Sequence, residues 1–235
     1  MDPKDRLIIA LDCSDETTAL ALAEKTGAYA GVFKVGFQLF SALGPSIVEK
    51  LSKRYGKVFL DLKFHDIPNT VGKASQSILD YGVYMFNVHA SGGLDMMKKA
   101  AEARSRFPGQ KPLAIAVTVL TSINTITLNE ELGISGTTAE HAIKLAKLAA
   151  QAGLDGVVCS GEEIKAVKKA CGANFKTIVP GVRPEWFKEK DDQKRVITPS
   201  EAIKAGADFI VVGRPITGAD DPSKAARRVL EEISS

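Results

Sequence analysis

Asp61 and Lys63 stand two residues apart in an apolar run, 58–64, whose composition favours a β-strand. Because side chains alternate along a strand, these two charged side chains are expected to point to the same face. Buried charges are costly unless they are paired or used in chemistry. Asp66 follows just beyond the predicted strand. The spacing therefore favours a catalytic cluster, with a purely structural network of ion pairs as the alternative.

Two more charged residues lie at the ends of neighbouring predicted strands. Lys34 lies near the end of 31–36, and Asp12 ends 7–12. In a parallel barrel the C-terminal ends of the strands meet at one mouth, where active sites form. We therefore expect both residues to converge on the cluster described above, which weakens the purely structural interpretation.

A second group of residues follows the last two predicted strands. One strand ends in Pro180-Gly181-Val182-Arg183 and the other in Val212-Gly213-Arg214. Barrels often bind phosphate in these loops, through backbone N–H groups and a helix N-terminus. Glycine lets the backbone approach a ligand closely, and an arginine presents a fork of donors to phosphate oxygens. The pattern predicts a phosphate site, with an ordinary turn and a surface arginine as the alternative.

Eight short apolar runs alternate with helical patterns along the chain. The predicted strands are 7–12, 31–36, 58–64, 85–90, 113–120, 156–160, 176–182 and 208–214. Most are almost continuously hydrophobic, as is typical of strands buried on both faces. Eight strand–helix units favour an α/β fold, a (β/α)₈ TIM barrel that forms a single domain over residues 1–235. A doubly wound open sheet is the alternative, but no glycine-rich dinucleotide fingerprint follows the first strand.

Several helix starts and two long loops can be recognised in the sequence. Capping boxes occur at 137–140, 160–163 and 198–201, and Asp221-Pro222 opens the last helix. Segments 121–137 and 183–197 follow the fifth and seventh strands without clear periodicity. We expect both to be lid-like loops on the catalytic face.

The bulk composition limits the possible partners. With 235 residues, 25% of them charged, and a net charge of +3, the chain has the composition of a globular protein and no evident basic patch for nucleic acid. A small anionic ligand remains compatible. The three cysteines match no metal-binding or CxxC pattern, and we see neither a signal peptide nor a membrane span. We therefore expect a cytoplasmic protein.

The motifs resemble those of the orotidine 5′-phosphate decarboxylase family. The most specific is Asp61-Leu62-Lys63-Phe64-His65-Asp66-Ile67-Pro68-Asn69-Thr70, and the others are IIALD, FKVG, Val119-Leu120-Thr121-Ser122, Val179-Pro180-Gly181-Val182-Arg183 and Ile210-Val211-Val212-Gly213-Arg214. They follow the family's order over essentially the whole chain. The resemblance implies decarboxylation of orotidine 5′-monophosphate to UMP, the last step of pyrimidine nucleotide synthesis, without cofactor or metal. It also implies a homodimer with active sites at the interface.

The resemblance also implies roles for individual residues. Lys63 resembles the donor of a proton to C6, within a charged array of Lys34, Asp61, Lys63 and Asp66. Asp66 and Thr70 would reach in from the other subunit. The implied substrate contacts are Asp12 and Lys34 for the ribose, Thr121 for the pyrimidine, and Arg183, Gln193, Gly213 and Arg214 for the phosphate.

The residue types fit this chemistry. Loss of CO₂ from C6 leaves an electron pair in the plane of the ring, where the π system cannot delocalise it well. A fixed ammonium such as that of Lys63 could stabilise this charge and then donate its proton. Asp61 and Asp66 would keep the lysine charged. Whether Asp61 also destabilises the bound substrate or only positions Lys63 stays open.

Two other functions are possible. Hexulose-phosphate synthases and ketogulonate-phosphate decarboxylases share Asp-x-Lys-x-x-Asp but use Mg²⁺, with an acidic residue on the second strand where this chain has Lys34. That lysine would repel a divalent ion. A non-catalytic sensor of phosphate ligands is the other, since a fold alone does not specify activity. His65 and His89 lie near strand ends, and an orienting or packing role is favoured for both.

Overall fold

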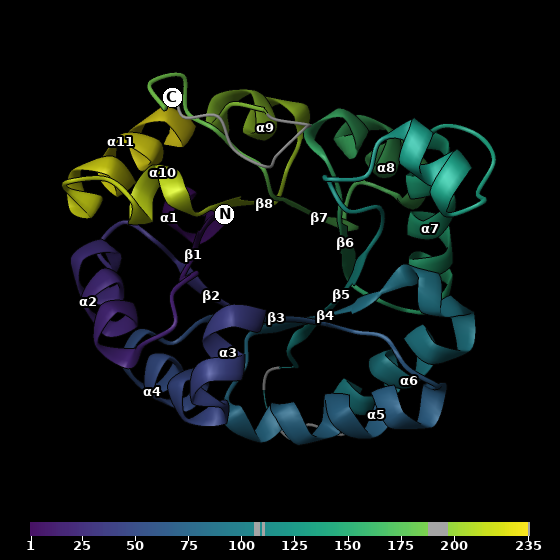
Figure 1. Ribbon diagram of the computed structural model, residues 1–235, viewed down its shortest axis with the longest axis horizontal. Helices are drawn as coiled ribbons and strands as arrows, with labels where there is room; N and C mark the ends of the chain where they lie inside the picture. Colours follow the sequence, from purple (N-terminus) through teal and green to yellow (C-terminus); the bar gives the residue numbers. More distant parts are fainter. Residues whose placement is uncertain (106–108, 110, 188–196, 235) are drawn as a thin grey trace.

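The fold is a closed barrel of eight parallel strands surrounded by helices (Figure 1). The computed structural model describes residues 1–105, 109, 111–187 and 197–234. The strands follow one another around the barrel in chain order, and β8 pairs with β1 to close it. They are β1 Leu7–Ala10, β2 Val32–Gly36, β3 Val58–Phe64, β4 Met85–His89, β5 Leu113–Val117, β6 Gly156–Val158, β7 Lys176–Val179 and β8 Phe209–Val212.

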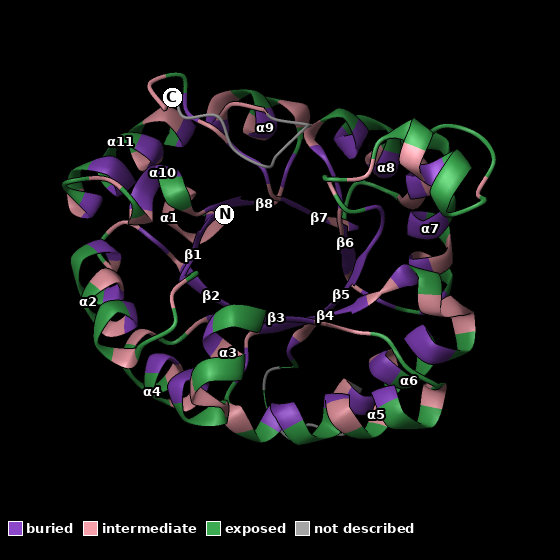
Figure 2. Ribbon diagram, in the orientation of Figure 1, coloured by how far each residue is buried: buried purple, intermediate pink, exposed green. Residues whose placement is uncertain are grey.

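Burial explains why these runs form the barrel. Almost every strand residue is buried, because one face meets the barrel interior and the other meets the helices (Figure 2). The inner face carries a compact apolar cluster that includes Ile8, Phe59, Met85 and Phe209. The outer faces join the larger core beneath the helices. The predicted (β/α)₈ TIM barrel is confirmed, and the open-sheet alternative is wrong.

The helices form an outer ring around the barrel (Figure 1). Their bounds are α1 Pro3–Arg6, α2 Glu16–Thr26, α3 Phe37–Leu43, α4 Pro45–Tyr55, α5 Pro68–Ser77, α6 Gly93–Ser105, α7 Thr138–Gln151, α8 Ile164–Cys171, α9 Pro199–Ala205, α10 Arg214–Thr217 and α11 Pro222–Ser234. All three predicted capping boxes are present, at Thr137, Ser160 and Thr198. None of the described helices is long and apolar enough to cross a membrane.

Several predicted strands end earlier than the sequence indicated. The first ends at Ala10, and Asp12 belongs to the loop that follows. Hydrogen bonding continues for one more residue, as Leu11 N donates to Lys34 O at 3.0 Å, before the chain leaves the barrel toward α2. The fifth strand likewise ends at Val117 and the seventh at Val179. The strand ends are shorter because the chain turns outward to form the loops of the mouth.

The two predicted loops differ in how much the structure describes. Segment 121–137 contains a π-helical turn, η3 (Thr127–Glu131), whose start is fixed by a hydrogen bond from Thr127 N to Asn124 Oδ1 at 2.9 Å. It is therefore not a segment without regular structure. Most of 183–197 lies outside the described residues, so its predicted role as a lid stays a prediction.

Candidate active site

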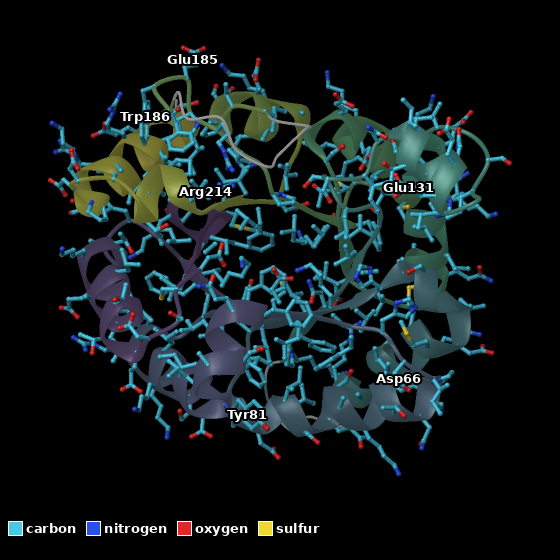
Figure 3. All side chains as sticks on the ribbon, viewed as in Figure 1. Asp66, Tyr81, Glu131, Glu185, Trp186 and Arg214 are labelled. Carbon is cyan, nitrogen blue, oxygen red and sulfur yellow. The ribbon has the colours of Figure 1, made fainter. Side chains whose placement is uncertain are left out.

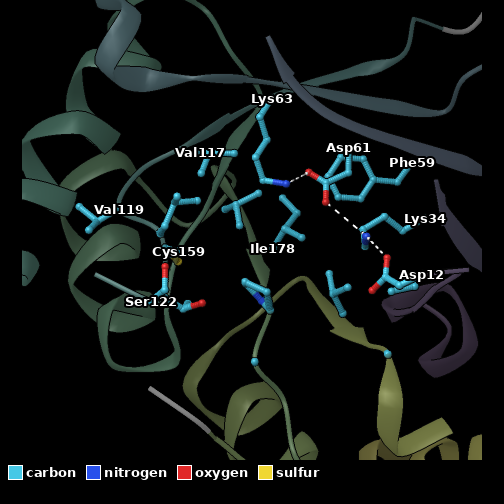
Figure 4. A pocket seen from close by; sticks show the side chains of 18 of the residues that line it. Asp12, Lys34, Phe59, Asp61, Lys63, Val117, Val119, Ser122, Cys159 and Ile178 are labelled. Atoms are coloured by element: carbon cyan, nitrogen blue, oxygen red, sulfur yellow. Dashed lines mark hydrogen bonds and ion pairs between the residues drawn. The ribbon is translucent and has the colours of Figure 1, made fainter. Parts of the chain in front are cut away.

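A cavity of about 350 Å³ opens at the C-terminal ends of the strands (Figure 4). Its floor is apolar and comes from the inner faces of the barrel: Ala10, Phe59, Ile178 and Val211. Charged side chains from β2, β3 and the loop after β1 form one wall. Residues that follow β5, β6, β7 and β8 form the rest. A cavity with an apolar floor and a charged wall suits a small ligand that carries both a ring and anionic groups.

The charged wall is a chain of alternating charges. Lys34 Nζ lies 2.9 Å from Asp12 Oδ1 and 3.4 Å from Asp61 Oδ2, and Lys63 Nζ lies 2.7 Å from Asp61 Oδ1 (Figure 4). Burial alone would lower the pKa of Lys34, but the attraction of Asp61 and then Asp12 outweighs it and raises the pKa above its usual value. The two aspartates therefore favour the charged ammonium form of Lys34.

Gly36 makes room for that ammonium. A Cβ built on Gly36 would lie 2.9 Å from Lys34 Nζ and 3.6 Å from Asp12 Oδ1. The backbone here is extended, so a side chain would be excluded by lack of space and not by backbone strain. Sequence reasoning missed this residue, although the glycine that ends the apolar strand was a visible signal.

Lys63 reaches the cavity through an irregularity in β3. The pairing of β3 with β4 shifts between Leu60 and Phe64, and Lys63 has a φ of 47°. Its ammonium contacts Asp61 on one side and lies 5.6 Å from the centre of the Phe37 ring on the other. The prediction that Asp61 and Lys63 share a face is confirmed, since both line the cavity, but simple alternation is not the reason.

Asn87 on β4 is a second residue that the sequence analysis overlooked. It is 1% exposed, and it bonds both to the Asp61 carboxylate and to the backbone N–H of Lys63. An asparagine inside the otherwise apolar run 85–88 was the available signal, because buried amides need partners.

The predicted phosphate residues line the part of the cavity formed by the loops after β7 and β8. Gly181 and Arg183 follow β7, and Gly213 and Arg214 follow β8, where α10 begins; all four line the cavity. A Cβ built on Gly213 would lie 3.6 Å from both Ala10 Cβ and Asp12 Oδ2, so its bare backbone faces the cavity beside the charged wall. Thr121 and Ser122 line the cavity from the loop after β5.

Two of the predicted residues that the structure describes are not in this cavity. Asp66 and Thr70 are exposed at the start of α5 and do not line it. Asp66 Oδ1 accepts a hydrogen bond from Ile67 N at 2.6 Å, and Figure 3 places Asp66 over α5, away from the barrel mouth. Within one chain, therefore, Asp66 does not flank Lys63. Gln193 lies outside the described residues.

The two histidines near the strand ends face each other outside the cavity. The rings of His65 and His89 have centroids 5.5 Å apart, and neither residue lines the cavity. Burial, followed by the charges of His65 and Lys63, lowers the pKa of His89. The described residues contain no group of three or more His, Cys, Asp or Glu side chains that could hold a metal ion.

Comparison with known proteins covers nearly the whole chain. The sequence model of the "Orotidine 5'-phosphate decarboxylase / HUMPS family" matches residues 5–229. The orotidine 5′-phosphate decarboxylase of Legionella pneumophila (strain Corby) is 51% identical over 234 residues, which cover 99% of this chain and 100% of the relative. That of Syntrophomonas wolfei is 47% identical over 238 residues, 99% of each chain.

Solved structures agree with this similarity. The crystal structure of orotidine 5′-phosphate decarboxylase from Lactobacillus acidophilus superposes with a TM-score of 0.86 at 35% identity, covering 98% of this chain and 100% of that one. An uncharacterized conserved protein from Geobacillus kaustophilus superposes with a TM-score of 0.83 at 37% identity, covering 97% of this chain and 99% of that one.

Proposed function

This chain belongs to the orotidine 5′-phosphate decarboxylase / HUMPS family, and we propose that the charged cavity is its active site, with Lys63 as the proton donor. The protein is an enzyme, a carboxy-lyase that converts orotidine 5′-monophosphate to UMP in pyrimidine nucleotide biosynthesis. A non-catalytic sensor is thereby set aside. The observation that supports the proposed site most strongly is the alternating chain of Asp12, Lys34, Asp61 and Lys63 along one wall.

The substrate spans the cavity from the charged wall to the loops after β7 and β8. Arg183, Gly213 and Arg214 bind the phosphate, since two arginines and exposed backbone offer several donors to its oxygens. Thr121 contacts the pyrimidine from the loop after β5. Asp12 and Lys34 contact the ribose, at the point where they meet in an ion pair. Gln193 remains a proposed phosphate contact outside the described residues.

The chemical step uses the Lys63 ammonium. The bond between C6 and the carboxyl carbon breaks, CO₂ leaves, and the electron pair stays on C6. A positive charge beside C6 stabilises this carbanion-like state in a cavity whose floor excludes water. Lys63 Nζ then transfers a proton to C6, which completes UMP, and the neutral amine regains a proton from solvent.

Asp61 supports this step mainly by holding Lys63 in place. One of its oxygens lies 2.7 Å from Lys63 Nζ, and the other lies 3.4 Å from Lys34 Nζ. A carboxylate between two ammonium groups fixes the position of both and keeps both charged. Those contacts support a positioning role, in preference to one that depends on repulsion of the substrate carboxylate.

The reaction proceeds without a metal or an organic cofactor. Support comes from Lys34, which is buried and positively charged in the wall where a divalent ion would have to bind. A magnesium-dependent reaction on a sugar phosphate is the second candidate, because the sequence motif Asp-x-Lys-x-x-Asp resembles that of such enzymes and the family description also names HUMPS. Relatives at 44–51% identity that are named orotidine 5′-phosphate decarboxylases favour the first.

The active assembly is a homodimer in which Asp66 and Thr70 of one subunit complete the site of the other. Both residues are exposed, and Ile67 between them has 67% of its surface exposed. Phe37, next to Lys63, is 56% exposed. Large apolar side chains that are exposed on one chain are typical of a surface that a second subunit covers. A cytoplasmic location is also proposed, supported by three free cysteines.

The decisive experiment follows the loss of orotidine 5′-monophosphate absorbance with purified enzyme in EDTA. We expect full turnover in the parent and none detectable in Lys63→Ala. The matched control is Lys57→Ala, because Lys57 precedes the same strand at the opposite end and forms a similar 2.6 Å ion pair with Asp5. Turnover that survives in Lys63→Ala would rule out the proposed donor. Activity only on a sugar phosphate with Mg²⁺ would support the second candidate.

A further inference from the structure

The pairing of β3 with β4 is irregular, because β3 has more residues than β4 between two of the paired positions. Leu60 pairs with Phe86 and Phe64 pairs with Val88, so three residues of β3, at 61–63, face the single residue Asn87. Extra residues in one strand leave backbone groups without a ladder partner. Both charged residues at the centre of the proposed chemistry, Asp61 and Lys63, lie in this bulge.

The bulge carries conformational strain at Lys63. Among the residues that the structure describes, Lys63 is the one non-glycine residue with a positive φ, 47°. A long side chain in this left-handed region is unfavourable and persists where surrounding contacts hold it. The conformation carries the lysine into the cavity, so the contacts that hold it also determine where the ammonium lies.

Asn87 supplies those contacts. Lys63 N donates to Asn87 Oδ1 at 2.7 Å, and Asn87 Nδ2 donates to Asp61 Oδ1 at 2.6 Å. The orientation of the amide is unambiguous, because a backbone N–H only donates and an ionised carboxylate only accepts. The same Asp61 oxygen also accepts from Lys63 Nζ at 2.7 Å. One buried amide therefore ties together the backbone of the proposed proton donor and the carboxylate that holds its ammonium.

We propose that Asn87 is a positioning residue for the decarboxylation, which it supports by fixing the Lys63 backbone and the Asp61 carboxylate in the geometry that places the ammonium at C6. This inference rests on the proposed role of Lys63. Asn87 does not line the cavity, so it acts through the other two residues. Its amide is neutral, and it therefore orients Asp61 without adding a charge that would compete with Lys63 for the carboxylate.

A purely structural role would also require a buried amide with two partners. The two roles differ in their response to a carboxylate at position 87. Asn87→Asp keeps the size of the side chain and the acceptor for Lys63 N, but it replaces the donor with an oxygen next to Asp61 Oδ1. Two carboxylates at such a distance retain one proton between them more readily than an isolated carboxyl group does. That proton restores the missing donor, so lowering the pH should restore the geometry.

The experiment measures kcat and KM for orotidine 5′-monophosphate in the parent, Asn87→Ala, Asn87→Asp and Thr177→Val between about pH 5.5 and pH 8. Thr177 is the matched control, since it is a fully buried polar residue of β7 bonded to Asp208 at the other end of the barrel. Melting temperature and circular dichroism establish that each variant is folded. Loss of turnover in Lys63→Ala tests the proposed proton donor separately, so failure of one proposal does not hide failure of the other.

We expect Asn87→Ala to lower kcat by roughly 10- to 100-fold, as loss of a hydrogen bond to a charged group predicts, with KM changed less than about threefold. For Asn87→Asp, the ratio of its kcat to that of the parent should rise as the pH falls. Thr177→Val should change stability and leave both kcat and the pH profile unchanged. If folded Asn87→Asp shows a kcat ratio that does not depend on pH, or if its kcat stays close to that of the parent throughout, the positioning role is wrong.

Discussion

Lys34 Nζ occupies the space in which a side chain on Gly36 would stand, 2.9 Å from the position of the missing Cβ. The two residues lie on the same face of β2, two positions apart. The charged wall of the cavity therefore depends on a glycine that has no side chain of its own. Lys34 is held between Asp12 and Asp61.

Gly36→Ala should consequently disrupt the charged wall. The added methyl group displaces the ammonium from Asp12, and we expect kcat/KM to fall about 10-fold or more, which corresponds to loss of one charge-assisted hydrogen bond. Any fall in melting temperature should come from the displaced ion pair, because the backbone conformation at Gly36 suits any residue. Steady-state kinetics with orotidine 5′-monophosphate measure the effect. An unchanged kcat/KM in Gly36→Ala would mean that the exact position of the Lys34 ammonium does not matter for the reaction.

Mixing two inactive variants tests whether Asp66 acts across a dimer interface. Lys63→Ala and Asp66→Ala should each be nearly inactive alone. After subunit exchange at equal amounts, half of the dimers are mixed, and each mixed dimer contains one site with both residues intact. We therefore expect recovery of about a quarter of parental activity.

The control for this experiment is a mixture of Lys63→Ala with Asp61→Ala. Both residues line the cavity of the same chain, so every site in a mixed dimer lacks one of them and activity should not return. Light scattering determines the oligomeric state of each sample. Recovery of activity in the control mixture would contradict the proposed arrangement. So would the absence of activity in the mixture of Lys63→Ala with Asp66→Ala, once subunit exchange has been demonstrated.

Asp208 should make the barrel sensitive to acid. Burial alone would raise its pKa, but hydrogen bonds from Lys168, Thr177 N and Lys176 outweigh burial and lower the pKa below 3.8. A lowered pKa stabilises the folded protein above about pH 3.8, and this stabilisation is lost as the pH falls through the folded-state pKa. Asp208→Asn should reduce the free energy of unfolding at pH 7 by about 2–4 kcal/mol, since two partly buried lysines lose their partner.

Urea unfolding at several pH values measures this contribution. The difference between parent and Asp208→Asn should begin to shrink as the pH falls below the ordinary pKa of an aspartate, where the unfolded chain takes up a proton, and should be lost once the folded carboxylate is also neutral. Glu49→Gln is the control: its partner Lys53 is 3.6 Å away and 80% exposed, so the change should stay below about 0.5 kcal/mol. If the free energy of unfolding of Asp208→Asn were lower than that of the parent by the same amount at every pH, lost packing and not lost charge would be responsible.

Segment 121–137 should become protected when nucleotide binds. Thr121 and Ser122 line the cavity at its start, and the π-helical turn η3 lies within it. We propose that it acts as a lid and expect slower amide hydrogen exchange in 121–126 with saturating UMP. Exchange in α4, Pro45–Tyr55, is the internal reference, because that helix contributes nothing to the cavity. Equal exchange of 121–126 with and without UMP would contradict the lid.

Local patterns were sufficient for the architecture. An apolar strand is recognisable from its own residues because burial on both faces demands continuous hydrophobicity, and all eight predicted strands exist. Capping boxes such as Thr137 with Glu140 are equally local, since both partners lie within one helical turn. Residues at the ends of consecutive parallel strands must meet at one mouth, which is why Asp12, Lys34, Asp61 and Lys63 could be grouped in advance.

Relations between strands required the tertiary structure. Strict alternation along the strand predicted that Lys63 faces the cavity, which is correct. The side chain reaches the cavity, however, through the bulge opposite Asn87. A bulge is a change of register, and register depends on two strands together. The Lys34 ammonium lies beside Gly36 because it forms ion pairs with Asp12 and Asp61, which come from two other segments of the chain. Asp66 is only three residues from Lys63 in the sequence, yet it is exposed in the loop before α5 and does not line the cavity of its own chain, because a short loop can reverse the direction of a side chain. The sequence determined which residue types meet at the barrel mouth, and packing between strands decided their distances, since those distances depend on residues far apart in the chain.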